Sequence, residues 1–334
     1  MIRIGLLGAS RIAREAVIAP ALDIAGATVT RVAARSMAHS RAYADEYGIP
    51  DVEPDYAALV ASDDVDLVYN GLPPSAHKDW TIAALAAGKH VLCEKPFAMN
   101  AGEAREMVAA SAATGGFLME AFHYRFHPLF ARIIEILRTG ETGAIRNLHA
   151  HFRVPIAFGE EELRYRPELG GGALMDLGCY PVHWVRTLMG EDPVVLSAEA
   201  ELHRSGVDIV AEAELGFSGG VIARVQCAMA GSLPDRLDAR LSVTGETGRL
   251  IVDNPLAPHT GHELVVETAA GSRREQVQGK STYHHQLQHV VDALGGRTGP
   301  LLDGADAIGN MRVLDAIVEM AGLRSTPRKV GRKS

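Results

Sequence analysis

Short apolar runs alternate with helical segments over the first 122 residues, and this alternation limits the fold more than any other feature of the sequence. Runs such as IRIGLL, VDLVYNG and FLMEAF read as buried strands, and the segments between them have helical periodicity. One such helix is expected from about residue 76 to 87, with Ser75 as its N-cap. Strands that alternate with helices pair in parallel through right-handed crossovers. The sequence therefore predicts an α/β domain built on a parallel sheet over residues 1–122.

The rest of the chain follows a different pattern. Residues 123–302 contain several strand-like runs with few helices between them, and many of these runs alternate apolar and polar residues. Such alternation is typical of an antiparallel sheet with one covered face. We therefore predict a C-terminal α+β domain with a large, mostly antiparallel open sheet. A helix over residues 303–324 is expected to pack back on the first domain, and residues 325–334 form a basic tail.

The composition argues against several classes of protein. The net charge is −8 and no basic residues gather in a long run, so no nucleic-acid partner is expected. No apolar run approaches the roughly 18 residues that span a membrane, so no membrane partner is expected either. The three cysteines are widely spaced and form neither a disulfide framework nor a zinc motif. These features suit a cytoplasmic protein.

The first predicted turn, residues 8–13 (GASRIA), nearly spells the dinucleotide fingerprint G-x-G-x-x-G/A. In that motif a helix N-terminus receives a pyrophosphate, and the middle glycine lets the backbone approach it closely. Ser10 replaces the middle glycine, but its hydroxyl can donate a hydrogen bond to a phosphate oxygen. The segment is either a Rossmann-type dinucleotide turn or an ordinary strand–turn–helix.

The end of the second predicted strand bears on the choice of nicotinamide cofactor. NAD-preferring folds place an acidic residue here to bind the ribose hydroxyls. This chain has VAARS instead, in which Arg35 can pair with a 2′-phosphate and Ser36 can hydrogen-bond to it. We therefore expect NADP to be preferred over NAD. The alternative is a surface arginine beside the N-cap of the next helix.

Four later segments carry a family resemblance. YNGLPPSAH and CEKPFAMN each follow a predicted strand, FLMEAFHYRFHP marks the domain junction, and GGGALMDLGCYPVHW lies in the second domain. Together with the first turn, these motifs make the chain similar to the Gfo/Idh/MocA oxidoreductases over nearly its whole length. It most resembles the branch of aldose 1-dehydrogenases, dihydrodiol dehydrogenases and anhydrofructose reductases.

The resemblance implies an NAD(P)-dependent oxidoreductase that transfers a hydride to or from a sugar, cyclic polyol or trans-dihydrodiol. It implies cofactor contacts at Gly8, Ser10, Arg11, Ile12, Arg35, Ser36, Asn70, Leu72, Pro73, His77, Glu94 and Lys95. The catalytic residues that it implies are Lys95, Asp176 and Tyr180. The substrate contacts that it implies are Tyr124, Arg125, Asp176, Tyr180 and His183. Tyr124 and Arg125 suit interdomain packing equally well, and His183 also suits a hydrogen-bonded position in the core.

Tyr180 raises a chemical question, because some related enzymes carry a catalytic histidine at the matching position. The identity of the general base therefore stays open. An unperturbed tyrosine has a pKa of about 10 and is a poor base at neutral pH. A neighbouring ammonium favours the phenolate. We accordingly expect Lys95 to lower the pKa of Tyr180 and to polarise the substrate oxygen.

Further expectations concern metals, assembly and rival functions. His285 and His289 lie four residues apart, but no third ligand follows at a metal-binding spacing, so no metal is predicted. The resemblance implies a homodimer or homotetramer that forms through the open face of the C-terminal sheet. Two other functions stay open: a non-catalytic dinucleotide sensor, and an NAD-dependent glycoside hydrolase that uses redox assistance.

Overall fold

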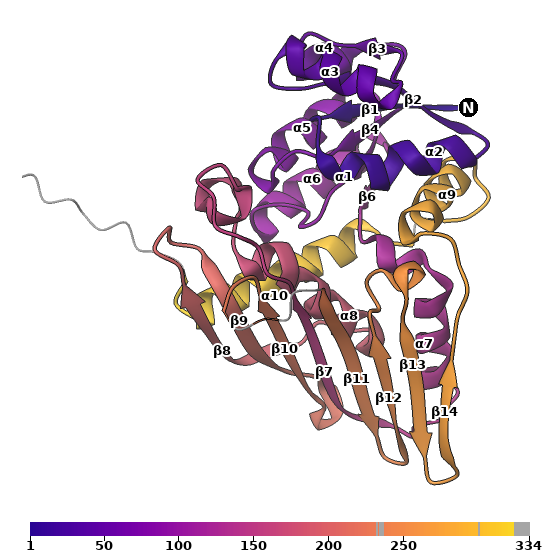
Figure 1. Ribbon diagram of the computed structural model, residues 1–334, viewed down its shortest axis with the longest axis vertical. Coiled ribbons are helices and arrows are strands. Elements are labelled where there is room, and N and C mark those ends of the chain that lie inside the picture. The colour runs from indigo at the N-terminus through magenta and orange to yellow at the C-terminus, as the bar shows by residue number, and fades with distance from the viewer. Residues whose placement is uncertain (232, 234–236, 300, 324–334) are drawn as a thin grey trace, which may run out of the picture.

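The computed structural model describes residues 1–231, 233, 237–299 and 301–323, and it shows two domains stacked along the long axis of the molecule (Figure 1). The first domain contains strands β1 (Ile2–Leu7), β2 (Ala27–Ala33), β3 (Asp51–Val52), β4 (Leu67–Asn70), β5 (His90–Cys93) and β6 (Leu118–Glu120). Its helical segments are α1 (Arg11–Ala13), η1 (Arg14–Ile18), α2 (Ala19–Asp23), α3 (Met37–Tyr47), α4 (Tyr56–Ala61), α5 (Pro74–Ala86) and α6 (Ala101–Thr114).

All neighbouring strands of the first sheet run parallel, in the order β3-β2-β1-β4-β5-β6, which confirms the predicted α/β domain. The register aligns the strand ends. Leu7 lies opposite both Ala33 and Asn70, and Cys93 lies opposite both Asn70 and Glu120. The loops that follow these strands therefore leave one edge of the sheet side by side, and this is the edge at which parallel sheets bind ligands.

Local capping explains where the helices of this domain begin. Ser36, Asp55 and Asn100 each accept a hydrogen bond from the backbone N–H three residues ahead, as N-cap residues do. The expected Ser75 cap is wrong, because α5 begins at Pro74, two residues before the expected start, and its N-cap is Pro73. Proline suits the first helical position, since its fixed φ is already helical and its missing N–H would have no partner there.

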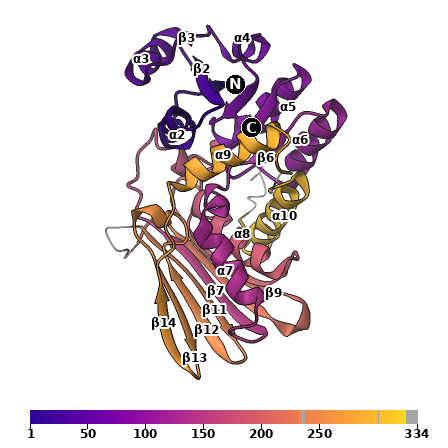
Figure 2. The same cartoon turned by 90° about the vertical axis from the view of Figure 1, so that its right-hand side faces the viewer.

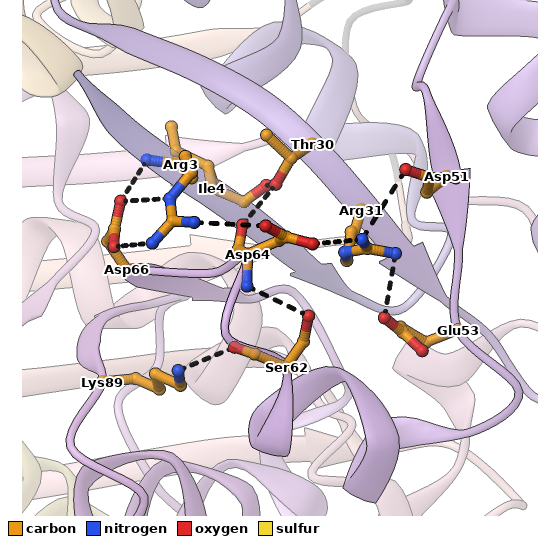
Figure 3. A network of polar contacts seen from close by, with 10 residues as sticks. All are labelled: Arg3, Ile4, Thr30, Arg31, Asp51, Glu53, Ser62, Asp64, Asp66 and Lys89. Carbon is orange, nitrogen blue, oxygen red and sulfur yellow. Dashed lines mark hydrogen bonds and ion pairs between the residues drawn. The ribbon is translucent and has the colours of Figure 1, made fainter.

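A polar network fixes the loop that leads into β4 (Figure 3). Asp66 accepts hydrogen bonds from Arg3, the shortest at 2.6 Å, and Asp64 bonds to both Arg3 and Arg31. Arg31 also pairs with Glu53, just after β3, at 3.1 Å. These groups join β1, β2 and the β3 edge to the loop, and they therefore support the sheet whose far ends carry the candidate site.

The second domain is built on strands β7 (Ile145–Arg153), β8 (Val194–Leu202), β9 (Asp208–Gly216), β10 (Ile222–Ala228), β11 (Asp238–Gly245), β12 (Gly248–Asp253), β13 (Glu263–Thr268) and β14 (Gly271–Glu275). They form one sheet in the order β14-β13-β12-β11-β7-β10-β9-β8. Of the pairs between described strands, β7 with β10 is parallel and the others are antiparallel. The predicted large, mostly antiparallel sheet is confirmed, although the sequence pattern does not predict β13 and β14.

Helices cover one face of this sheet and leave the other face open (Figure 2). The helical segments of this half are η2 (His123–Phe126), α7 (Pro128–Arg138), η3 (Leu163–Tyr165), η4 (Pro167–Leu169), η5 (Leu174–Gly178), α8 (Cys179–Met189), η6 (Ser218–Gly220), η7 (Pro258–Thr260), α9 (Thr282–Leu294) and α10 (Gly304–Met320). Ala223 and Val225 of β10 point into the covered core, whereas Arg224 between them is exposed and pairs with Glu214. The open face therefore carries charged side chains that pair across strands.

The last two helices return the chain to the first domain. α10 packs against α6 as well as against α8 and β8, and Ala101 at the start of α6 donates its N–H to Asp315 at 3.0 Å. α9 packs against η1 and α2. Both helices therefore bridge the two domains. The basic tail predicted for residues 325–334 lies outside the described residues. Within those residues, no helix has the length and apolar content that crossing a membrane requires.

Candidate active site

The first turn has the shape of a phosphate-binding site. Gly8 adopts φ +90°, which favours glycine, and a Cβ there would lie 3.1 Å from Leu72. Ser10 is the N-cap of α1, and the Tyr43 hydroxyl holds its carbonyl oxygen at 2.8 Å. The Ser10 hydroxyl itself is buried and has no hydrogen-bond partner among the described residues. Buried polar atoms normally have a partner, so this hydroxyl fits a dinucleotide pyrophosphate at the start of the helix.

Four more predicted cofactor contacts border this turn. Arg35 and Ser36 are both exposed just after β2. The Ser36 hydroxyl accepts the His39 N–H at the start of α3, and its own proton stays available to a ligand. Arg11 is exposed and approaches Glu162 at 3.9 Å, whereas Ile12 is half-buried against the core. The exposed guanidinium of Arg35 is thus available to an anion at this edge of the sheet.

Asn70 and His77 are buried and hold the loop after β4 by hydrogen bonds. Asn70 is fully buried and donates to the His77 carbonyl at 3.2 Å and to Thr81 Oγ1 at 3.1 Å. The His77 ring lies between two loops, with Nε2 2.7 Å from the Leu72 carbonyl and Nδ1 3.0 Å from the Pro96 carbonyl. These contacts tie the loop after β4, in which Leu72 is buried, to the loop after β5. Both residues therefore support the cofactor loops through the backbone.

Pro73 and Glu94 occupy the neighbouring loop positions. Pro73 is half-buried and serves as the N-cap of α5. Glu94 is 7 % exposed, accepts a hydrogen bond from the Tyr69 hydroxyl at 2.7 Å and accepts the Lys95 N–H at 3.2 Å. Burial raises the pKa of Glu94, against the lowering effect of Lys95. Tyr69, which the sequence does not single out, therefore fixes the carboxyl group beside Lys95.

Lys95 and Asp176 form the central ion pair of the site, and they come from different domains. Lys95 Nζ lies 2.8 Å from Asp176 Oδ1 and 2.9 Å from the Asp176 carbonyl. Arg164 Nε holds the other carboxylate oxygen at 2.6 Å and is itself paired with Glu162 at 3.0 Å. Burial works to raise the pKa of Asp176, but Lys95 and Arg164 lower it to about 2. Burial works to lower the pKa of Lys95, but Asp176 outweighs it and the pKa is raised. Both groups are therefore charged at neutral pH.

Tyr180 lies beside this pair, but its acidity is not what the sequence predicts. Lys95 Nζ is 5.2 Å from the centroid of the Tyr180 ring, so the ammonium lies over the ring face. Burial raises the pKa of Tyr180 well above its ordinary value, and Asp176 adds to the effect. The expected lowering by Lys95 is wrong in this structure, because the Lys95 charge is paired with Asp176 and the phenol is buried. Tyr180 is therefore a neutral phenol at neutral pH.

Tyr124 and His183 hydrogen-bond to each other in the interior. The Tyr124 hydroxyl meets His183 Nδ1, and His183 Nε2 lies 2.7 Å from Asp306 Oδ2 of α10. Both residues are 0 % exposed, so their polar atoms are already used by the protein. Arg125 stacks over the Phe130 ring at 5.4 Å. Tyr124 and His183 thus occupy hydrogen-bonded positions in the core, whereas Arg125 is half-buried against a ring of its own domain. Substrate contacts by these residues, and by Asp176 and Tyr180, stay predictions.

Asp208 supports the site from the start of β9 and has no local signal in the sequence. Its Oδ2 accepts the Leu174 N–H at 2.6 Å and thereby holds the start of η5, the π-helical turn that carries Asp176. A Cβ on Gly172 would meet Asp208 Oδ1 at 2.2 Å. Burial raises the pKa of Asp208 to about 6. The helix with Asp176 and Tyr180 is thus anchored by one buried carboxyl group.

The two domains thus bring three features to one edge of a parallel sheet: a turn whose buried Ser10 hydroxyl has no partner among the described residues, an ion-paired lysine and a buried tyrosine. The turn fits a dinucleotide, and the lysine and tyrosine can polarise an oxygen and transfer a proton. No group of three or more potential metal ligands is found among the described residues. The fold and the site define a dinucleotide-dependent oxidoreductase.

Comparison with known proteins identifies the family. Residues 2–122 match the model of the oxidoreductase family with an NAD-binding Rossmann fold, and residues 130–251 match the GFO/IDH/MocA C-terminal domain. The chain belongs to the Gfo/Idh/MocA oxidoreductase family, as the sequence motifs indicate.

Two relatives and one solved structure illustrate the similarity. The chain is 34% identical over 320 residues to D-xylose 1-dehydrogenase (NADP(+)) 2 of Haloferax volcanii, covering 95% of this chain and 96% of that protein. It is 30% identical over 331 residues to trans-1,2-dihydrobenzene-1,2-diol dehydrogenase of Xenopus laevis, covering 96% and 98%. The structure of a 3-ketoreductase from Actinomadura kijaniata in complex with NADP and TDP-benzene superposes with a TM-score of 0.88 at 27% identity, covering 96% and 97%.

Proposed function

We propose that this chain is an NADP-dependent oxidoreductase that interconverts a secondary alcohol or hemiacetal and the corresponding carbonyl of a sugar, cyclic polyol or trans-dihydrodiol. The observation that carries the proposal is the contact between domains in which Asp176 holds Lys95 Nζ at 2.8 Å while Lys95 lies over the Tyr180 ring. The names of the relatives support the same chemistry, since they include a sugar dehydrogenase and a dihydrodiol dehydrogenase.

Two features of this chain favour NADP. The end of β2 carries no acidic side chain that would bind the ribose hydroxyls of NAD. It carries instead the exposed Arg35, which we propose to pair with the 2′-phosphate, while Ser10 and the backbone after Gly8 hold the pyrophosphate. One relative and one similar structure are named with NADP.

The residues of the site divide the chemistry between them. The bound nicotinamide supplies or accepts the hydride. The Lys95 ammonium donates a hydrogen bond to the substrate oxygen and stabilises negative charge that develops there. Asp176 keeps Lys95 charged, and Arg164 restrains the far side of the carboxylate. Tyr180, with its raised pKa, is protonated at neutral pH and therefore suits the donation of a proton to a carbonyl oxygen.

The test is a steady-state assay of the full chain with NADPH or NADP, followed by NADPH absorbance, on a panel of aldoses, cyclic polyols, trans-dihydrodiols and the corresponding carbonyl compounds. We expect turnover with at least one class. Lys95→Met is expected to abolish turnover while NADPH still binds, as measured by calorimetry. Clear NADPH binding by the wild-type chain without turnover on any member would contradict the proposal and favour the dinucleotide sensor. Release of sugar from a glycoside would favour the hydrolase.

The proposed compartment is the cytoplasm. The three cysteines, Cys93, Cys179 and Cys227, are all buried free thiols. Unpaired cysteines suit a reducing compartment. Burial raises the pKa of each of these thiols, so none of them is poised as a reactive thiolate.

A further inference from the structure

His123 stands directly behind the phenol of Tyr180. Its Nε2 lies 3.2 Å from the Tyr180 hydroxyl, and its Nδ1 lies 2.7 Å from Thr282 Oγ1. His123 is 4 % exposed and Thr282 is 0 % exposed, so no bulk water competes for these contacts. The three residues come from η2, α9 and α8, which places a buried histidine between two hydroxyl groups on separate elements.

The surroundings of His123 keep its ring neutral. Burial lowers its pKa to about 3, and the charge of Lys95 and the ring of His259 act in the same direction. Tyr283 lies against the ring with centroids 4.0 Å apart, and Tyr180 approaches its edge at 5.9 Å. Neither hydroxyl partner is charged at neutral pH. A neutral imidazole carries one ring proton, so one nitrogen donates and the other accepts.

We propose that His123 is a positioning residue for Tyr180: the Thr282 hydroxyl donates to Nδ1, the ring proton therefore sits on Nε2, and Nε2–H donates to the Tyr180 oxygen. The inference rests on the proposed function, because it assigns Tyr180 the role of proton donor. With its oxygen already accepting a hydrogen bond from His123, the Tyr180 hydroxyl directs its own proton away from the histidine and toward the substrate.

In the direction of reduction, Tyr180 supplies the proton that the carbonyl oxygen gains. The hydride reaches the carbonyl carbon, the Tyr180 O–H bond breaks, and its proton goes to the carbonyl oxygen, which becomes an alcohol. The resulting phenolate keeps the hydrogen bond from His123 Nε2–H, which stabilises its charge. A proton from water then restores the phenol. His123 stays neutral throughout and neither gains nor loses a proton.

Matched variants separate the two ends of the ring. In His123→Gln the amide can reach the place of Nε2, whereas in His123→Asn it can reach only the place of Nδ1. We expect His123→Asn to lower kcat about tenfold or more, as the loss of one hydrogen bond to a developing charge predicts, with NADPH affinity unchanged. His123→Gln is expected to retain most of the activity. Thr282→Val is expected to lose part of it, and Thr282→Ser to restore it.

A double-mutant cycle tests whether His123 acts through Tyr180. In a Tyr180→Phe background, His123→Asn is expected to cause no further loss of kcat, because the hydroxyl that it positions is gone. If the two losses multiply instead, His123 has a merely structural role and the inference is overturned.

A second readout needs no turnover and therefore separates this inference from the proposed function. Nitrogen NMR of histidine-labelled full-length protein, assigned by loss of the signal in His123→Asn, reports which ring nitrogen is protonated. We expect a neutral ring with the proton on Nε2 across neutral pH, and a change of tautomer in Thr282→Val. A proton on Nδ1 in the wild type would overturn the inference even if the enzyme is active. A wild type with this tautomer but no turnover would contradict the proposed function while the contact itself stands.

Discussion

At the scale of single residues, the proposed chemistry requires that Lys95 stays protonated. Burial alone would favour loss of its proton, and Asp176 is the main group that prevents this. We predict that Asp176→Asn lowers the pKa of Lys95, because the opposing burial effect remains. The loss of activity at alkaline pH should then begin at a lower pH than in the wild type, measured as kcat/KM against pH.

Glu162→Gln is the matched control for that change, because Glu162 bonds to Arg164 and not to Lys95. In the Glu162→Gln variant, kcat/KM should fall at the same alkaline pH as in the wild type. If kcat/KM of Asp176→Asn falls at the same alkaline pH as that of the wild type, the ion pair does not set the charge of Lys95 during turnover.

At the same scale, Arg35 is the residue that we propose to select NADP over NAD. A hydrogen-bonded arginine–phosphate contact contributes about 1.5–3 kcal/mol. We therefore predict that Arg35→Ala weakens NADP binding about ten- to a hundredfold and changes NAD binding little. Isothermal titration calorimetry with both cofactors measures this directly. Arg41→Ala, an exposed arginine on α3, is the control. Equal losses for the two cofactors would mean that Arg35 does not contact the 2′-phosphate.

At the scale of elements, Asp208 couples the stability of the η5–α8 helix to pH. Its pKa in the folded state is raised to about 6, above the value of about 4 for a free aspartate. The folded state therefore binds the proton more tightly, and the associated stability is fully present below about pH 4 and is lost as the pH rises through about 6. The shift corresponds to at most about 3 kcal/mol.

Asp208→Asn keeps an oxygen for the Leu174 N–H but cannot ionise. We predict that the free energy of unfolding of this variant, relative to wild type, rises as the pH increases from about 4 to about 7. Urea unfolding at both ends of this range measures the difference. Asp253→Asn on the open sheet face serves as the control. A difference between wild type and Asp208→Asn that does not change with pH would contradict the raised pKa.

The elements also show where sequence patterns stop being informative. The helices with periodic apolar faces and clear caps are predicted, such as the one that Ser36 begins. β14 is not predicted, because its residues GSRRE are exposed except for the half-buried Glu275, and β13 is the strand it pairs with, so the run carries no burial pattern. The π-helical turn η5, which carries Asp176 directly before the helix of Tyr180, also leaves no mark in the spacing of apolar residues.

For the candidate site, local motifs identify the residues that stand at strand ends or in one helix. Lys95, Asp176 and Tyr180 are predicted from such motifs through the family resemblance that the motifs carry. Their supporting partners are not, because His123 and Thr282 meet only through the packing of η2 against α9. The protonation states also depend on burial. This is why the expected lowering of the Tyr180 pKa by Lys95 does not hold.

At the scale of the whole molecule, the site exists only where both domains meet. Lys95 comes from the loop after β5 and Asp176 from η5, and α10 spans the two halves (Figure 2). Arg186 of α8 ties α10 to the second domain through a hydrogen bond to Asp306 at 3.1 Å, and it also bonds to Asp192, just after α8, at 2.6 Å. A change that loosens α10 should therefore weaken the ion pair between Lys95 and Asp176, although α10 does not contact that pair directly.

The open face of the second sheet leads to the last prediction, which concerns assembly. We propose that copies of the chain associate through this face as a dimer or tetramer. The face presents ion pairs such as Arg224 with Glu214 and Arg240 with Asp253 rather than an apolar layer. Association through such a surface should weaken with salt, because screening shortens the reach of surface charges from about 10 Å at 0.1 M to about 3 Å at 1 M.

We predict that the wild-type chain has the mass of a dimer or tetramer in light scattering at low salt, and that high salt lowers this mass. The double variant Arg224→Glu/Arg240→Glu places like charges opposite Glu214 and Asp253 and should be monomeric, with an unchanged circular dichroism spectrum. Arg41→Glu, an exposed charge reversal on α3 in the other domain, should leave the mass unchanged. A wild-type monomer would contradict the proposal. A multimer that persists in the double variant would also contradict it, because reversed charges on this face should repel a copy that docks there.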